Sequence, residues 1–145
     1  MGPQHGGGIT LNAIVIGDKV RAAVIYGGVS GDMAKYWNHA NAMWHRDEMN
    51  GAAERFGTPA DRPDGYTKMS ALNYVKHIQA AVSIHHGTAD EQVPYAWSEE
   101  LRDRLLAAGK DVEHFAYPGA RHSFTGADRT LFLERVAAFF DRHLR

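Results

Sequence analysis

The sequence predicts an α/β fold in which about three parallel strands are flanked by helices. Three apolar runs that end in glycine carry this prediction, and they cover residues 20–28, 80–87 and 111–119. A strand that is covered on both faces of a sheet is typically a continuous apolar run of this kind. Helical patterns lie between and after the runs, and such alternation is typical of a parallel sheet with right-handed crossovers. The length of 145 residues fits a single domain over residues 1–145.

A first helix is expected over residues 6–17, ahead of the first strand. Ile9, Ala13 and Ile16 recur there at helical spacing, and Gly17 can end the helix. Three glycines open this segment, as at a turn where a strand passes into a helix.

The segment 31–68 interrupts the alternation of strands and helices. Residues 32–57 form a helical pattern that carries Trp37 and Trp44, while residues 58–68 contain two prolines and are expected to form a loop. We expect a helical insertion near a pocket that packs its aromatic side chains on the sheet. A roof over that pocket is compatible with this interpretation.

Two further helices are expected in the C-terminal half. The pattern over residues 96–109 has one apolar face, acidic residues in its first turns and Gly109 at its end. The pattern over residues 128–145 has Asp128 as its expected N-cap and apolar residues at helical spacing after it.

Composition excludes several classes of function. The net charge is −1, so neither nucleic acid nor an anionic membrane is an expected partner. There is no cysteine, and therefore no disulfide framework or thiolate chemistry is expected. Neither a signal-peptide pattern nor an apolar run of roughly 20 residues occurs, so we expect a cytoplasmic globular domain. The nine histidines form no H-x-x-x-H spacing, so neither a metal nor another cofactor is expected.

Two loops carry the residues with the clearest chemistry. Asp90 follows the run that ends at Gly87, and His122 follows the run that ends at Gly119. Ligands of open parallel sheets bind beyond the carboxyl ends of the strands. Adjacent strands would bring the carboxylate and the imidazole together, and a carboxylate fixes the tautomer of a histidine and stabilises its protonated form. This is the acid–base pair of a serine hydrolase.

The same loops carry a family resemblance that spans nearly the whole chain. The stretches GTADEQVP at 87–94, YPGARHSF at 117–124 and YGGVSGDM at 26–33 resemble the prolyl-oligopeptidase-like (S9) peptidases and esterases. The resemblance implies the C-terminal half of an α/β-hydrolase fold. It also implies that Asp90 is the triad acid and His122 the base.

The chain departs from this family at the nucleophile. The family's elbow reads G-x-S-x-G, and here Gln4 stands at the serine position between Gly2 and Gly6. The backbone N–H of His5 could still act as one oxyanion donor. The elbow's own strand and the strands before it would lie ahead of Gly2, so we expect a truncated hydrolase domain without its N-terminal strands.

Another nucleophile is conceivable. Ser30 lies at the carboxyl end of the first strand and could lie near His122, although capping the next helix is the more usual role for such a serine. Gln4 could donate a hydrogen bond to a substrate carbonyl or could simply belong to a redundant N-terminus.

These observations leave two functional interpretations. The first is a hydrolase of small acyl esters, or of peptides, that uses Asp90 and His122 with a serine or water as nucleophile. The second is a non-catalytic remnant that serves as a binding or structural module. In either case residues 20–28 would form an exposed apolar edge, so we expect a homodimer or higher homo-oligomer that covers it. The alternative at this edge is a gene fragment that aggregates when alone.

Overall fold

The computed structural model describes residues 3–43 and 46–145, with side chains described for 5–43 and 50–145. Its elements are α1 (Pro3–Ile16), β1 (Ala22–Tyr26), α2 (Met33–Met43), α3 (Arg46–Phe56), α4 (Pro63–Met69), the 3₁₀ helix η1 (Ala71–His77), β2 (Ala81–Gly87), α5 (Ala96–Ala107), β3 (Val112–Tyr117) and α6 (Gly126–Leu144).

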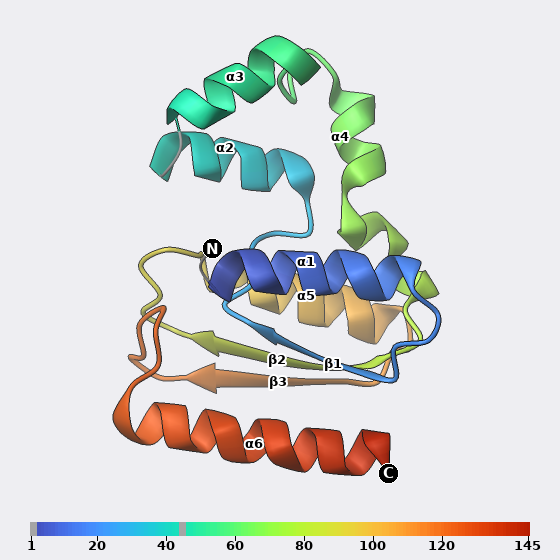
Figure 1. The fold of residues 1–145 in the computed structure, drawn as a ribbon, viewed down its shortest axis with the longest axis vertical. Helices are drawn as coiled ribbons and strands as arrows, with labels where there is room; N and C mark the ends of the chain where they lie inside the picture. The colour runs from blue at the N-terminus through green and yellow to red at the C-terminus, as the bar shows by residue number, and fades with distance from the viewer. Residues whose placement is uncertain (1–2, 44–45) are drawn as a thin grey trace.

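The three strands form one parallel sheet in the order β1-β2-β3. Ile25 of β1 lies opposite Ile84 of β2, and His85 of β2 lies opposite Phe115 of β3. Helices α1 and α5 cover one face of the sheet and α6 covers the other (Figure 1). The prediction of a parallel three-stranded sheet between helices is therefore confirmed.

The face under α1 and α5 holds the main apolar core. Val82 and Ile84 of β2 are almost fully buried there, against Leu11 of α1 and against Leu101 and Leu105 of α5. Each such side chain contributes about 1.5–3 kcal/mol when it is fully removed from water. Packing on both faces leaves all seven residues of β2 buried, the polar Ser83, His85 and His86 included.

The face under α6 contains a buried chain of polar side chains. Tyr117 O–H lies 2.9 Å from His85 Nδ1, and His85 Nε2 lies 2.8 Å from Ser83 Oγ. The Ser83 hydroxyl donates to Glu113 Oε1 at 2.8 Å. Because the Ser83 proton is used on Glu113, His85 must donate from Nε2 and accept from Tyr117 at Nδ1. Burial, with a smaller contribution from the charge of Arg135, lowers the pKa of His85 to about 4.

This histidine should make the protein sensitive to acid. Its pKa lies below the ordinary value of about 6.5, so the stability that neutral His85 contributes is present above pH 6.5 and is lost as the pH falls toward 4. We expect the free energy of unfolding to be about 2 kcal/mol lower at pH 5 than at pH 7 from this residue. Urea denaturation at both pH values should show a smaller difference for His85→Gln, and an equal difference in both proteins would contradict the assignment.

Several helix boundaries differ from those expected. Helix α1 begins at Pro3 rather than at residue 6, because proline suits the first position of a helix and the glycines lie inside the helix. A Cβ on Gly7 would lie 2.6 Å from the Cα of Gly28, so glycine here permits close packing and does not form a turn. Helix α6 begins at Gly126 with Thr125 as its N-cap, and Asp128 lies in its first turn.

The segment 31–68 also departs from expectation. Its part from 58–68 is not all loop, since α4 begins at Pro63, again a suitable first position. Helices α2, α3 and α4 stack beyond α1, on the side away from the sheet (Figure 1). Trp37 accordingly packs edge-on against Tyr66, with 5.6 Å between the ring centroids, so the expectation that it packs on the sheet is wrong. Trp44 lies outside the described residues.

Candidate active site

Asp90 lies on the turn that follows β2, at the carboxyl edge of the sheet. Its Oδ1 atom accepts the backbone N–H groups of Gln92 and Val93, each at 2.8 Å. These bonds are those of an aspartate that stabilises its own turn, as aspartate side chains often do. The carboxylate is thereby fixed, with Oδ2 left to face the rest of the site.

His122 lies on the loop that follows β3, beside Asp90. Its Nδ1 atom lies 2.8 Å from Asp90 Oδ2, and the two side chains are only 2% and 1% exposed. The structure thus brings together the two residues that the strand order predicts to meet. A carboxylate at Nδ1 orients the ring so that Nε2 is the atom able to exchange a proton with a reacting group.

The loop that carries His122 is held by one side chain from β1 and one from the turn after β2. Tyr26, the last residue of β1, donates its O–H to the carbonyl of His122 at 2.5 Å and accepts the N–H of Phe124 at 2.7 Å. Glu91 Oε2 accepts the N–H of His122 at 3.1 Å. His122 is therefore fixed through its backbone as well as through its ring.

The surroundings of Asp90 favour its ionised form. Burial alone would raise its pKa, but hydrogen bonds from His86, from the Val93 N–H and from His122 outweigh burial and hold the pKa well below the ordinary value. Asp90 therefore carries its charge throughout the physiological pH range, as an acid that supports an imidazolium must.

Two glycines join this pair to the start of α1. Gly27 has a φ of +50°, and a Cβ there would lie 3.2 Å from His122 Cε1 and 3.5 Å from Asp90 Oδ2. On the next residue, Gly28 packs against Gly7 of α1. The first turns of α1 and the His122 ring therefore lie on either side of this glycine pair.

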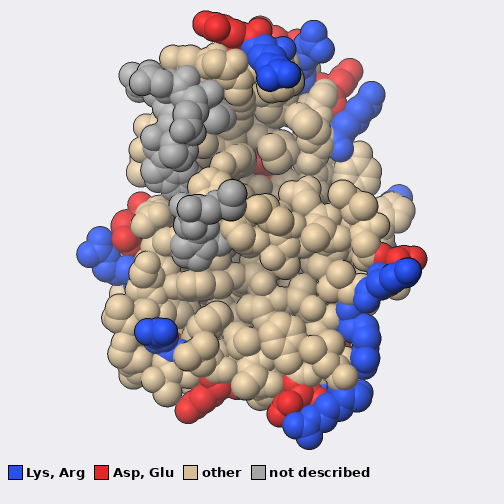
Figure 2. Space-filling model, viewed as in Figure 1, with Lys and Arg blue, Asp and Glu red and all other residues tan. Residues whose placement is uncertain are grey.

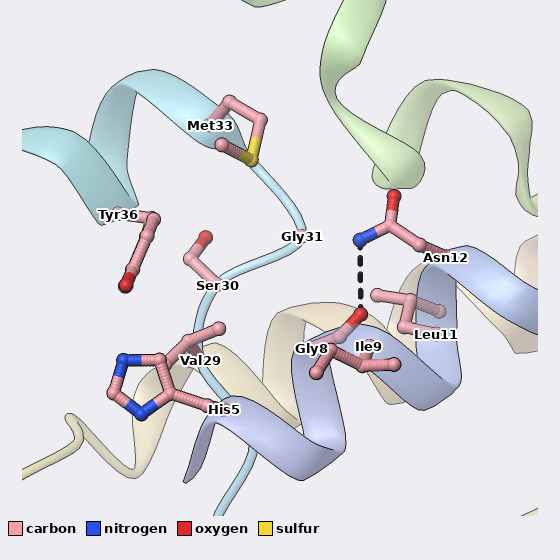
Figure 3. Close-up of a pocket in the computed structure, with 10 residues that line it drawn as sticks. All are labelled: His5, Gly8, Ile9, Leu11, Asn12, Val29, Ser30, Gly31, Met33 and Tyr36. Carbon is pink, nitrogen blue, oxygen red and sulfur yellow. Dashed lines mark hydrogen bonds between the residues drawn. The ribbon is translucent and has the colours of Figure 1, made fainter. Parts of the chain in front are cut away.

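An apolar pocket of about 220 Å³ lies beside the first turns of α1. Its walls come from α1, from the segment that joins β1 to α2, and from Met33 and Tyr36 of α2 itself (Figure 3). The rings of His5 and Tyr36 meet edge-on across it, with 6.4 Å between their centroids. The hydroxyl of Ser30 points into the same region (Figure 3). Neither Asp90 nor His122 lines this pocket.

The other candidate residues take different positions. Ser30 is buried, and its Oγ accepts the N–H of Asp32 at 3.1 Å. Asp32 in turn caps α2 by accepting the N–H groups of Ala34 and Lys35, so Ser30 shapes the turn ahead of the cap. His5 lies in the first turn of α1. The side chain of Gln4 lies outside the described residues.

Sequence reasoning missed two residues that contact the pair. Alternation along β2 turns His85 and His86 to opposite faces of the sheet, and nothing in the local sequence distinguishes His86 from a packing residue. His86 in fact lies 3.1 Å from Asp90 Oδ2. Tyr26 carries no local sequence signal for its bond to the carbonyl of His122, which lies 96 positions further along the chain.

Metal and membrane chemistry find no support in the described ranges. Among residues 3–43 and 46–145, no group of three or more His, Cys, Asp or Glu residues is arranged to hold a metal ion. Within the same ranges, every helix is too short or too polar to cross a bilayer.

Comparison with known proteins gives consistent matches. A family model described as the prolyl oligopeptidase family matches residues 5–145. An uncharacterized peptidase of Bacillus subtilis, YtmA, is 31% identical over 114 residues, which cover 79% of this chain. A puromycin-hydrolyzing peptidase of Mycobacterium tuberculosis superposes with a TM-score of 0.82 at 25% identity over 97% of this chain. Dipeptidyl peptidase 4 of Porphyromonas gingivalis superposes with a TM-score of 0.77 at 25% identity over 96%.

The chain is much shorter than these proteins. It covers 42% of the Bacillus subtilis peptidase, 21% of the Mycobacterium tuberculosis structure and 18% of the Porphyromonas gingivalis structure.

Proposed function

This chain belongs to the prolyl oligopeptidase family, and from that premise we propose that Asp90 and His122 are the acid and base of a carboxylic-ester or peptide hydrolase. Its sheet and flanking helices are part of an α/β-hydrolase fold. The observation that carries the proposal is the 2.8 Å contact between Asp90 Oδ2 and His122 Nδ1 in a buried setting at the carboxyl edge of the strands.

The proposed chemistry is acyl transfer with His122 as general base. His122 Nε2 takes the proton of the attacking O–H group as its oxygen bonds to the acyl carbon, and ionised Asp90 stabilises the resulting imidazolium. When the bond to the leaving oxygen or nitrogen breaks, the same proton passes to the leaving group. The His5 N–H, in the positive first turn of α1, is suited to stabilise the oxyanion between these steps.

The attacking group is proposed to be water, or Ser30 as the alternative. In the proposed alignment with the G-x-S-x-G elbow, the serine position is taken by Gln4, whose amide is not a nucleophile. The hydroxyl of Ser30 remains able to donate because the bond from Asp32 N–H uses only an acceptor site of its oxygen. The small apolar pocket beside His5 favours a short acyl group over a long peptide.

Hydrolysis of short-chain p-nitrophenyl esters tests this proposal. We expect activity in the natural sequence that is lost in His122→Ala, and Ser30→Ala distinguishes the two nucleophiles by losing or retaining it. A general base contributes typically about 10²–10⁴-fold, so the loss in His122→Ala should be of this order. Equal rates in all three proteins, or no hydrolysis in any, would support a non-catalytic binding or structural module instead.

We also propose that a second copy of the chain covers the open edge of β1. Gly27 N–H bonds to His85 O of β2, so alternation turns the N–H of Val24 toward the open edge. The neighbouring face over α1 is largely uncharged, with charges at its margins (Figure 2), and Ile9 and Ile16 are 57% and 85% exposed on α1. Both features favour an apolar contact between copies.

Replacing Val24 by proline tests this assembly. Proline lacks the N–H that would pair across the edge, and that N–H makes no bond to β2, so the fold should tolerate the change. We expect sedimentation velocity to show a dimer for the natural sequence and for Val24→Thr, and a monomer for Val24→Pro. A natural chain that sediments as a monomer would refute the proposal.

A further inference from the structure

His86 is a second imidazole that contacts the candidate acid Asp90. Its Nε2 atom lies 3.1 Å from Asp90 Oδ2 and 3.1 Å from the carbonyl oxygen of Val93. The His86 side chain is fully buried, and its ring packs edge-on against Tyr95 at 5.6 Å. The ring is therefore held in place by packing and by two polar contacts at one nitrogen.

The partners of His86 fix where its proton lies. A carbonyl oxygen and a carboxylate are both acceptors, so Nε2 must carry the proton. The other ring nitrogen, Nδ1, is buried and has no hydrogen-bond partner within the described part of the chain. A buried N–H without a partner is costly, which also favours an unprotonated Nδ1.

The carboxylate of Asp90 thus has four donors on two oxygens. Oδ1 accepts two backbone N–H groups, while Oδ2 is shared by His86 and His122. Burial acts to raise the pKa of Asp90, and the largest of the contributions that lower it comes from the His86 hydrogen bond. Two imidazole rings, those of His86 and His122, therefore contact the same buried oxygen of Asp90.

We propose that His86 is a positioning residue for the acid–base pair: its Nε2–H shares Asp90 Oδ2 with His122, keeps the carboxylate charged and sets how strongly it holds the His122 ring. This inference rests on the proposed function, because it assigns a role within the same site. It also explains a buried histidine for which apolar packing alone offers no reason.

The wild-type protein, labelled with ¹⁵N-histidine, gives the first test by NMR. The imidazole nitrogen shifts of His86 at pH 7 should show a proton on Nε2 and none on Nδ1. A proton on Nδ1 would overturn the proposal, and this measurement requires no variant to fold.

Variants then test whether His86 acts through Asp90. In His86→Leu, Oδ2 loses one of its two imidazole donors, so the His122 Nδ1–H proton resonance should move to higher frequency. In His86→Gln the side-chain amide can replace the donor, and the resonance should stay near its wild-type position. His85→Gln is the matched control, since it alters an equally buried neighbour on the other face of the sheet and should leave the resonance unmoved.

A purely structural role for His86 would change the melting temperature but not this pattern. An unmoved resonance in His86→Leu, or the same movement in His86→Gln, would overturn the proposal. If His86→Leu does not fold, the wild-type proton position and the His86→Gln resonance decide the question. Failure of the proposed hydrolase function would appear separately, as missing ester hydrolysis with these resonances intact.

Discussion

Asp90→Asn is expected to lower the free energy of unfolding by about 3 kcal/mol and to abolish hydrolysis that depends on His122. The carboxylate, which is 1% exposed, accepts three hydrogen bonds and is contacted by His86 Nε2 at 3.1 Å. An asparagine side chain offers one oxygen and directs an NH₂ group at donors. Either the Gln92 and Val93 N–H groups or the two imidazoles then lose their acceptor.

Urea denaturation at pH 7 and pH 3 measures this effect. The pKa of Asp90 is held below its unfolded value, so its contribution is complete above about pH 4 and is lost as the pH falls further. The difference between the natural protein and Asp90→Asn should therefore shrink from pH 7 to pH 3. A variant that is as stable as the natural protein at pH 7 would show that these contacts contribute nothing.

Gly87→Ala is expected to have the second large effect on stability and hydrolysis, because Gly87 at the end of β2 packs closely against the loop that carries His122. A Cβ at Gly87 would lie 2.3 Å from the carbonyl oxygen of Ala120 and 2.8 Å from that of Arg121. Backbone atoms must move to admit it, and we expect destabilisation of about 1–3 kcal/mol. The same movement should displace His122 from Asp90 and reduce hydrolysis beyond what the lost stability explains.

Gly51→Ala is the matched control for this substitution. Gly51 lies in α3, is exposed, and has nothing within 4 Å of an added Cβ. Alanine is favoured over glycine inside a helix by roughly 0.5–1 kcal/mol, so this variant should be slightly more stable. Chemical denaturation measures the free energy of unfolding of both variants. Equal stability of Gly87→Ala and the natural protein would contradict the close approach of Gly87 to the backbone of Ala120.

The sheet and the meeting of Asp90 with His122 were predictable from sequence. The run that forms β2 is buried on both faces, while β1 and β3 are buried only in part, and parallel strands bring their following loops to one edge. The boundaries of α1 and α4 were less accessible because Pro3 and Pro63 act as first helix residues, whereas proline also marks loops.

The contacts that surround the pair were not predictable in the same way. Tyr26 reaches His122 across 96 positions of the chain, and no local pattern encodes such a bond. His86 lies four positions before Asp90, but the turn that folds Asp90 back toward it depends on the hydrogen bonds of Gln92 and Val93. The stacking of α2, α3 and α4 beyond α1 likewise depends on tertiary packing, as the contact of Trp37 with Tyr66 illustrates.

Placing a serine at position 4 tests most directly whether Asp90 and His122 form a hydrolase acid–base pair. The measurement is p-nitrophenyl ester hydrolysis by Gln4→Ser, alone and combined with His122→Ala. We expect Gln4→Ser to raise the rate by about 10²-fold or more and the second change to abolish that gain, because a serine nucleophile needs its base. No gain in Gln4→Ser, or a gain that survives the loss of His122, would contradict the account.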